Sequence, residues 1–281
     1  MKPFELCAFA DEASPELDGQ ISALCGNGMK LIELRGVDGK NVAELSPAEA
    51  KNVKERLDRH GIRVWSIGSP IGKTDVNAPA AIEKDRFNRI LEIARICGAE
   101  NIRLFSFYGT DGSSASFDLV CRQLDDMLTD ARGSGVELCH ENEKDIWGDT
   151  AARCEALHLA LPALRGIFDP ANFVQCGEDT LAAWDLLGKY IKYAHIKDAK
   201  ADGHVVPAGQ GDGRIPELLP RFCDAGIEVL TLEPHLKVFK GLAGLEKGDV
   251  TAVVGGRTAF PDGRSAFDYA SETLKKLISE M

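Results

Sequence analysis

The sequence has no apolar run that approaches the roughly 18 residues that a membrane-spanning helix needs. It opens with MKPFELCAFADEAS, which lacks the long apolar segment and the small-residue cleavage site of a signal peptide. We therefore expect no membrane partner and no export, and the expected location is the cytoplasm.

Closely spaced cysteines are also missing. The sequence therefore predicts neither a disulfide framework nor a structural zinc knuckle, and the thiols are expected to be reduced and to serve as small core residues. The eight cysteines are scattered along the chain, at Cys7, Cys25, Cys97, Cys121, Cys139, Cys154, Cys176 and Cys223.

Positive charge is in short supply as well. Lys and Arg number 33 against 44 Asp and Glu, which gives a formal net charge of −11. Such a balance repels polyphosphates, so no nucleic-acid partner is expected. The hydrophobic share of 44% in 281 residues is ordinary for a globular protein with a sizeable core.

What the sequence does contain is a repeated order of helix, glycine and strand. In RLDRHGIRVWSIG, a helical pattern ends at Gly61 and a β-rich run begins directly after it. Gly28, Gly61, Gly98 and Gly135 follow one another at spacings of 33, 37 and 37 residues. This spacing fits one strand, one helix and two short loops in each unit.

Eight strand-like stretches can be assigned in this way, each followed by a helical pattern. Eight such units predict an α/β fold, a single (β/α)8 TIM barrel over residues 1–281 as one domain. The alternative is an open doubly wound sheet, but that fold usually has a glycine-rich phosphate loop after its first strand, and FADEASPEL is not one. The strands are expected at 4–10, 30–35, 62–68, 101–107, 136–141, 164–169, 191–196 and 227–233, and the last helix at 265–280.

Two connections are longer than is usual in such a domain, at residues 197–213 and 234–264. Both follow strands, so they are expected at the active-site face of the barrel. The first contains GQGDG, which could cradle a phosphate, although glycines in long loops more often only form turns. The second is a candidate contact in a homo-oligomer.

Four consecutive strands end in polar residues that could meet at one point. They are Glu141 in ELCHEN, Asp169 in GIFDPAN, His195 in KYAHIKD and Glu233 in VLTLEPHL. One acidic residue at a strand end is more often a helix cap, but four at equivalent positions in neighbouring units point to a shared site. Three carboxylates would repel one another there, so one bound divalent cation is predicted: Mn²⁺ first, with Mg²⁺, Co²⁺ or Zn²⁺ as alternatives. His140 should point away from this site, towards a helix.

At these residues the chain resembles the xylose isomerase-like TIM-barrel superfamily, which includes sugar isomerases and epimerases, keto-cyclitol and dehydroshikimate dehydratases, and endonuclease IV. The resemblance spans the chain and is most specific over residues 135–235. It implies that Glu141, Asp169, His195 and Glu233 are the metal ligands. The superfamily often has a histidine three residues after the strand-six aspartate, where this chain has Asn172.

The resemblance implies an isomerase or epimerase that acts on a sugar or sugar phosphate. In such enzymes a proton next to a carbonyl is removed and returned through a metal-stabilised enediolate, with Glu141 and Glu233 as the acid and base. A dehydratase that loses a hydroxyl after the same first step is the alternative. A nuclease like endonuclease IV is less favoured, because the chain has only six histidines and is acidic.

Four further residues are candidates for contacts with a carbohydrate substrate. Lys197 lies two residues after His195 and therefore on the same side of the strand. Asn172 could bind a hydroxyl group through its amide. Glu143 begins the loop after strand five, and His235 follows strand eight. Glu143, Lys144 or His235 could also protonate a leaving hydroxyl in the dehydratase alternative.

Overall fold

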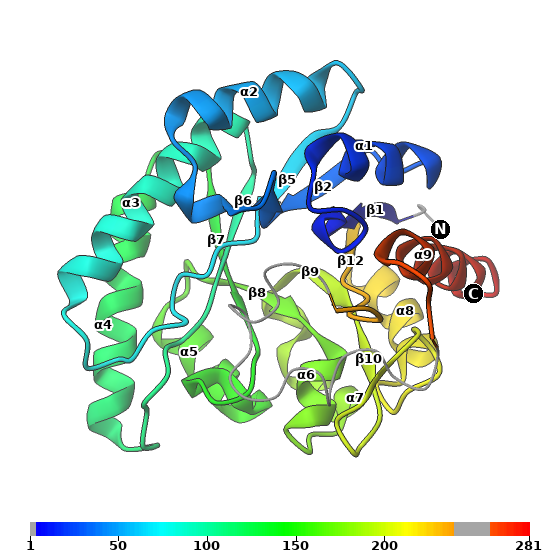
Figure 1. The fold of residues 1–281 in the computed structure, drawn as a ribbon. Coiled ribbons are helices and arrows are strands. Elements are labelled where there is room, and N and C mark those ends of the chain that lie inside the picture. The colour runs from blue at the N-terminus through cyan, green and yellow to red at the C-terminus, as the bar shows by residue number, and fades with distance from the viewer. Residues whose placement is uncertain (1–3, 239–258) are drawn as a thin grey trace.

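The computed structural model describes residues 4–238 and 259–281, and its centre is one sheet of eight parallel strands (Figure 1). The ladder runs in the order β1-β12-β9-β8-β7-β6-β5-β2, and β1 and β2 lie side by side at the two ends of that order. The sheet therefore forms a nearly closed TIM barrel. The strands are β1 (Glu5–Ala8), β2 (Leu31–Leu34), β5 (Arg63–Ile67), β6 (Asn101–Leu104), β7 (Glu137–Glu141), β8 (Arg165–Phe168), β9 (Ile191–Ile196) and β12 (Val229–Leu232).

The α-helices surround the strands, and each strand is followed by at least one of them (Figure 1). The last helix lies beside the first, where Asn27 Nδ2 donates a hydrogen bond to Asp268 Oδ1 at 2.6 Å. The helices are α1 (Leu17–Gly26), α2 (Pro47–Asp58), α3 (Ala80–Cys97), α4 (Ser114–Ala131), α5 (Ala151–Ala160), α6 (Pro170–Gln175), α7 (Thr180–Leu187), α8 (Ile215–Asp224) and α9 (Gly263–Ser279).

Local sequence signals account for several of these boundaries. The Ser46 side chain accepts a hydrogen bond from the Glu49 amide, and the Glu49 carboxylate accepts one from the Ser46 amide. This capping box starts α2, with Pro47 in its first turn. Gly98 ends α3 in the left-handed conformation, with φ of 67°. The other three periodic glycines of the sequence also have positive φ, so the spacing predicted real turns between helix and strand.

The inside of the barrel changes from apolar to charged along the strands. An apolar layer at the lower end includes Cys139, Tyr193 and Val229. Since alternate residues of a strand share a face, the residues two positions later point into the same interior. These include Glu141 after Cys139 and His195 after Tyr193, and both are almost completely buried. The apolar layer therefore serves as the floor of a charged interior that opens at the C-terminal ends of the strands.

All eight predicted strands are present, with small differences at their ends. The largest is at 101–107, where β6 stops at Leu104. Beyond it the chain pairs differently: Phe105 N donates to Ile71 O and Phe107 N to Gly72 O, while Phe107 adopts a φ of 65°. Strand propensity in LFSF was therefore overridden by a neighbouring loop. The last helix begins at Gly263 and ends at Ser279, close to the prediction of 265–280.

The long connection 197–213 contains a small antiparallel hairpin, β10 (Asp198–Ala199) with β11 (Val205–Val206), which was not predicted. Its glycine-rich part wraps around a carboxylate of the chain itself. Asp198 accepts hydrogen bonds from the amides of Gly209, Gly211 and Gly213, at 2.8 to 3.0 Å. These amides of GQGDG already hold an anion, so the loop does not offer them to a phosphate. Of the second long connection, residues 239–258 lie outside the described residues.

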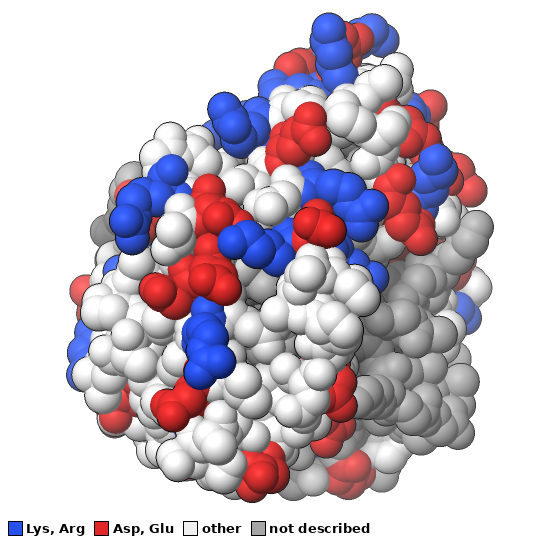
Figure 2. Space-filling model, turned by 90° about the vertical axis from the view of Figure 1, so that its left-hand side faces the viewer, with Lys and Arg blue, Asp and Glu red and all other residues white. Residues whose placement is uncertain are grey.

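All eight cysteines lie in the described part of the chain and none forms a disulfide. Among the described helices, none has the length and apolarity that crossing a membrane would require. On the face in Figure 2, acidic and basic side chains are interspersed and form no continuous basic area.

His158 of α5 is a buried histidine behind the barrel wall, and it allows a test of this packing. Its ring stacks on Tyr190 with centroids 4.8 Å apart, and His140 packs against it from β7, as the strand alternation predicted. Its Nδ1 lies 3.2 Å from the carbonyl oxygen of Leu164. Burial lowers the pKa of His158 to about 4, against an ordinary value near 6.5.

We expect the fold to lose stability as the pH falls from about 6.5 towards 4, because only the unfolded chain then takes up the proton at His158. One such site contributes about 2 kcal/mol between pH 7 and pH 5. In His158→Phe this part of the loss should disappear, as measured by urea unfolding at both pH values with a chelator present. Exposed His60 provides the control, and His60→Phe should keep the wild-type pH dependence. An equal pH dependence in both variants would contradict the assignment.

Candidate metal centre and active site

The four predicted strand-end residues meet at the top of the charged interior. Glu141 is the last residue of β7 and His195 lies within β9, while Asp169 and Glu233 directly follow β8 and β12. None is more than 2% exposed. Each offers a ligand atom within 4.8 Å of those of the other three. The described residues therefore contain a compact set of three carboxylates and one imidazole.

Each carboxylate has one oxygen held by the protein and one turned towards the common point. Glu141 Oε2 accepts a hydrogen bond from Arg103 at 3.2 Å, and its Oε1 lies 2.9 Å from His195 Nδ1. Glu233 Oε1 accepts one from Arg35 at 2.9 Å, and its Oε2 lies 3.3 Å from the same nitrogen.

Asp169 follows the same pattern as the glutamates. Its Oδ1 caps α6 by accepting the Asn172 amide at 3.0 Å, while its Oδ2 accepts no hydrogen bond. Lys197 Nζ lies 3.0 Å from that Oδ2 and forms an ion pair with it. A buried carboxylate oxygen in this situation is well suited to a cation.

His195 is oriented from behind by a second carboxylate. Its Nε2 lies 3.2 Å from Glu33 Oε2, and Glu33 in turn accepts a hydrogen bond from Tyr193 Oη at 3.0 Å. A carboxylate partner on one ring nitrogen fixes a tautomer that leaves the other nitrogen free to bind a metal. Nδ1 is then the nitrogen that faces Glu141 and Glu233.

The protonation equilibria of the four residues reflect a site rich in negative charge. Burial alone disfavours a charged imidazole, but the carboxylates of Glu141 and Glu33 outweigh it and raise the pKa of His195. Burial likewise raises the pKa of Asp169, to about 7, against the opposing effect of Lys197. For Glu141, burial is outweighed by His195 and Arg103, which lower its pKa to about 2. The cluster thus attracts positive charge, and these donors fit a divalent cation bound through oxygen and imidazole nitrogen.

Of the four residues predicted to contact a substrate, three line one cavity and Asn172 does not. Lys197, Glu143 and His235 line a small cavity next to the four-residue cluster, together with Glu141 and Glu233. His235 adopts a φ of 45°, and its amide donates a hydrogen bond to Glu12 at 2.7 Å. Such a conformation is unfavourable for a residue with a Cβ and is often found at functional sites.

Asn172 does not line this cavity. Its Nδ2 donates to the carbonyl oxygen of Asn142 at 2.8 Å and lies 3.4 Å from Glu141 Oε1. Asn142 also pairs with the main chain of Asp169 in both directions. The Asn172 side chain therefore ties together the segments that carry Glu141 and Asp169.

Sequence reasoning missed the residues that the first strands contribute. Arg35 binds Glu233, Asp11 and Glu12, and Arg103 binds Glu141. The ring of Phe9 lies against both guanidinium groups, 4.2 Å from Arg35 and 4.9 Å from Arg103. The sequence does contain a sign of these residues. In LIELRG and NIRLF, charged residues interrupt an apolar strand at positions whose side chains point into the barrel.

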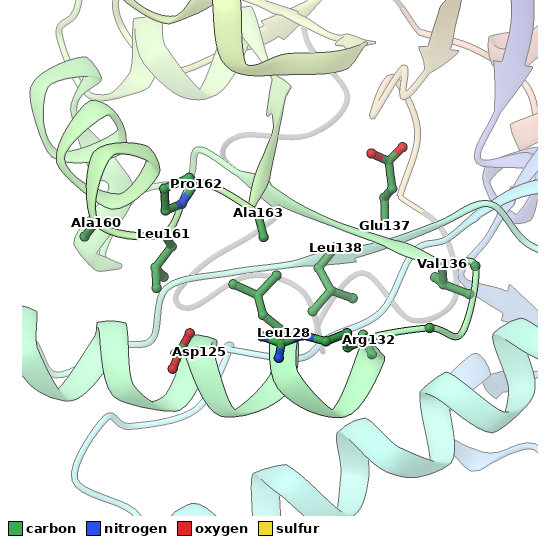
Figure 3. A pocket seen from close by; sticks show the side chains of 13 residues that line it. Asp125, Leu128, Arg132, Val136, Glu137, Leu138, Ala160, Leu161, Pro162 and Ala163 are labelled. Carbon is green, nitrogen blue, oxygen red and sulfur yellow. The ribbon is translucent and has the colours of Figure 1, made fainter.

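A larger groove lies at the opposite end of the barrel, between α4, the start of β7 and the α5–β8 connection (Figure 3). Its walls are mostly apolar, for example Leu128, Leu138 and Leu161. The acidic side chains of Asp125 and Glu137 lie at different places along it and do not converge (Figure 3). This groove has no cluster comparable to the one at the C-terminal ends of the strands.

The model of the xylose isomerase-like TIM barrel family matches residues 23–245. The chain belongs to this family. No curated protein is significantly similar to it in sequence. Many solved structures have a similar fold, and several of them superpose on nearly the whole chain.

Three of these structures illustrate the range of proteins with a similar fold. The L-ribulose 3-epimerase has a TM-score of 0.76 at 18% identity, with 100% of this chain and 95% of that chain covered. The IolI protein, whose structure contains a bound zinc atom, has a TM-score of 0.76 at 14% identity, with 99% of both chains covered. The probable 3-DHS dehydratase AsbF from Bacillus anthracis has a TM-score of 0.74 at 15% identity, with 98% and 99% covered. At such low identity these structures show a shared fold.

The contact between Glu33 and His195 predicts a measurable effect on metal binding. Glu33→Gln removes the negative charge behind the imidazole, and the affinity for Mn²⁺ should fall about 10- to 100-fold. Calorimetric titration of the metal-stripped protein would measure it. Exposed Glu55 on α2 is a matched control, and Glu55→Gln should bind Mn²⁺ like the wild type. Unchanged affinity in Glu33→Gln would mean that His195 is not a supported metal ligand.

Proposed function

We propose that this protein is a divalent-metal-dependent isomerase or epimerase that acts on a sugar by removing a proton next to a carbonyl group. The observation that carries this proposal is the pattern of oxygens around His195. Glu141, Asp169 and Glu233 each have one oxygen tied down and one directed to the same point. The named epimerases among the similar folds support the choice of reaction.

The metal would be held by Glu141, Asp169, His195 and Glu233, with Mn²⁺ as the first candidate for this oxygen-rich set. When bound, it would stabilise the negative charge that develops on the substrate oxygens and so make the neighbouring hydrogen more acidic. The side chains of the protein then have to move the proton and hold the substrate.

Glu141 and Glu233 are the proposed acid and base. Both lie within 3.3 Å of His195 Nδ1 and line the adjoining cavity, so they flank the place where a substrate would meet the cluster. For both, the effect of burial is outweighed by neighbouring positive charge, from His195 and Arg103 at Glu141 and from Lys197 and His195 at Glu233, which lowers each pKa. Both carboxyls are therefore ionised at neutral pH, in the form that accepts a proton. One carboxylate would remove the proton from one face of the substrate. The other, after it has taken up a proton from solvent, would deliver that proton to the opposite face and so invert a carbon centre, and the first would release its proton to solvent.

Lys197 and His235 are proposed to contact the substrate from the cavity wall. Lys197 Nζ lies 3.4 Å from Glu233 Oε2, where its ammonium group could hold a substrate oxygen next to the proposed base. Asn172 is proposed to act through Glu141 and Asp169, since its amide is bound within the protein. This differs from the direct hydroxyl contact expected from the sequence.

A dehydratase is the second candidate. It shares the proton abstraction but needs a further group to protonate a departing hydroxyl. His235 lines the cavity, and its Nε2 lies 3.5 Å from Glu233 Oε1, so its position suits this role. Burial lowers the pKa of His235 well below its ordinary value, which makes it a poor proton donor and favours the isomerase. Isomerisation retains the mass of the substrate, whereas dehydration loses water, so mass spectrometry of the product separates the two.

The proposal is tested by deuterium uptake from D₂O into uncharged keto sugars such as D-fructose and D-tagatose, with Mn²⁺-loaded protein. We expect exchange at a carbon next to the carbonyl. In Glu233→Gln the rate should fall about 100-fold or more, because the amide cannot accept the proton. The fold should survive, since Arg35 keeps its contacts to Asp11 and Glu12.

Glu92→Gln, on the exposed surface of α3, is the control and should exchange at the wild-type rate. Wild-type exchange in a folded Glu233→Gln would remove this residue from the proposed chemistry. A wild type that binds Mn²⁺ but gives neither exchange nor water loss with any keto sugar would overturn the proposed function.

A further inference from the structure

An ion pair that the proposed mechanism does not use lies inside the active-site cavity. Lys73 Nζ and Glu143 Oε2 are 3.1 Å apart, and their side chains are only 8% and 9% exposed. Both residues line the cavity that also contains Glu141 and Glu233. The ammonium group additionally lies 4.5 Å from the ring centroid of Phe105, another wall residue.

Lys73 is held in the cavity by a rigid backbone. The segment around it runs along the chain beyond β6, where Phe105 N donates to Ile71 O and Phe107 N to Gly72 O. Gly72 has a φ of 82°, and a Cβ at this position would lie 2.0 Å from the carbonyl oxygen of Phe105. Only glycine fits this approach. The stretch SPIGK therefore holds the backbone of Lys73 in one position at the cavity wall.

Glu143 is also fixed from its own side. Its Oε1 accepts a hydrogen bond from the Lys144 amide at 3.0 Å, and its amide donates to the carbonyl oxygen of Gly148 at 3.2 Å. The pair thus presents one ammonium donor group and one carboxylate acceptor, side by side, on a preformed wall.

The same matching of charge holds for the other cations of this cavity. Arg103 contacts Glu141 and Lys197 contacts Asp169, so each has a carboxylate of the protein next to it. A phosphate or carboxylate group brought into the cavity would lie against Glu141, Glu143 and Glu233 as well as against the cations. Like charges placed together in this way disfavour the wrong ligand.

The glycine-rich loop after β9 provides an independent observation. Asp198 already accepts the amides of Gly209, Gly211 and Gly213. Within the described residues, this loop therefore does not supply the backbone cradle that a phosphate ester often uses.

We propose that the Lys73–Glu143 ion pair determines specificity by binding hydroxyl groups of an uncharged substrate and by excluding phosphorylated or acidic sugars. The ammonium group donates to one hydroxyl oxygen and the carboxylate accepts from the next. This inference rests on the proposed function in taking a sugar as the substrate, and it resolves which class of sugar enters.

The test compares D-fructose with D-fructose 6-phosphate on Mn²⁺-loaded protein, by calorimetric binding and by deuterium exchange. The wild type should bind and exchange the uncharged sugar in preference to the phosphate ester. Glu143→Gln removes the negative charge but keeps the shape of the side chain. It should bind D-fructose 6-phosphate about tenfold or more tightly than the wild type does, and D-fructose more weakly.

Lys73→Met is the companion variant and should weaken D-fructose binding without any gain for the phosphate ester. The matched control is Glu155→Gln, which breaks an ion pair with Lys189 on the outside of the protein and changes the net charge equally. It should bind both sugars like the wild type. A wild type that prefers the phosphate ester, a Glu143→Gln with unchanged discrimination, or a wild type that binds neither sugar would overturn the inference. Correct discrimination in binding without any exchange would contradict the proposed function and leave this inference supported.

Discussion

The arrangement of the site depends on one constraint: several buried carboxylates at the C-terminal ends of the barrel strands have to be compensated. Glu33, Glu141, Asp169 and Glu233 are almost completely shielded from water. A buried charge without a partner is strongly destabilising, so each must be matched by a cation or by hydrogen bonds. Arg35, Arg103, Lys197 and His195 provide part of this compensation and at the same time orient the oxygens that face the common point.

This arrangement separates stability from function within one barrel. The lower layer around Tyr193 and Val229 is apolar, and helices cover the outside of the strands. The upper layer contributes little to folding by itself, because buried ion pairs rarely repay the cost of desolvation. It can be retained because the floor and the outer helices supply the burial on which the fold depends.

The sequence was sufficient for much of the fold and for the grouping of the four strand-end residues. Glycine-ended helices and β-rich runs predicted the eight units, and the polar strand ends identified Glu141, Asp169, His195 and Glu233, which the structure places together. The alternation of strand residues also placed His140 outside the barrel, next to His158.

What the sequence could not reveal were partners that are distant along the chain. Arg35 and Glu233 are 198 positions apart, and nothing local to either one indicates the other. Lys73 lies in a connection whose course is set by Phe105 and Phe107, so its entry into the cavity follows from tertiary packing. GQGDG could be interpreted as a phosphate loop because nothing near it indicates what its amides bind. Their acceptor, Asp198, lies more than ten residues earlier in the chain.

The most direct test is a crystal structure of the Mn²⁺-loaded protein with the ion located by its anomalous scattering. The account predicts a single ion bound by Glu141 Oε1, Asp169 Oδ2, His195 Nδ1 and Glu233 Oε2, with the other glutamate oxygens still on Arg103 and Arg35. An ion bound elsewhere, or bound through the oxygens that the arginines hold, would contradict it.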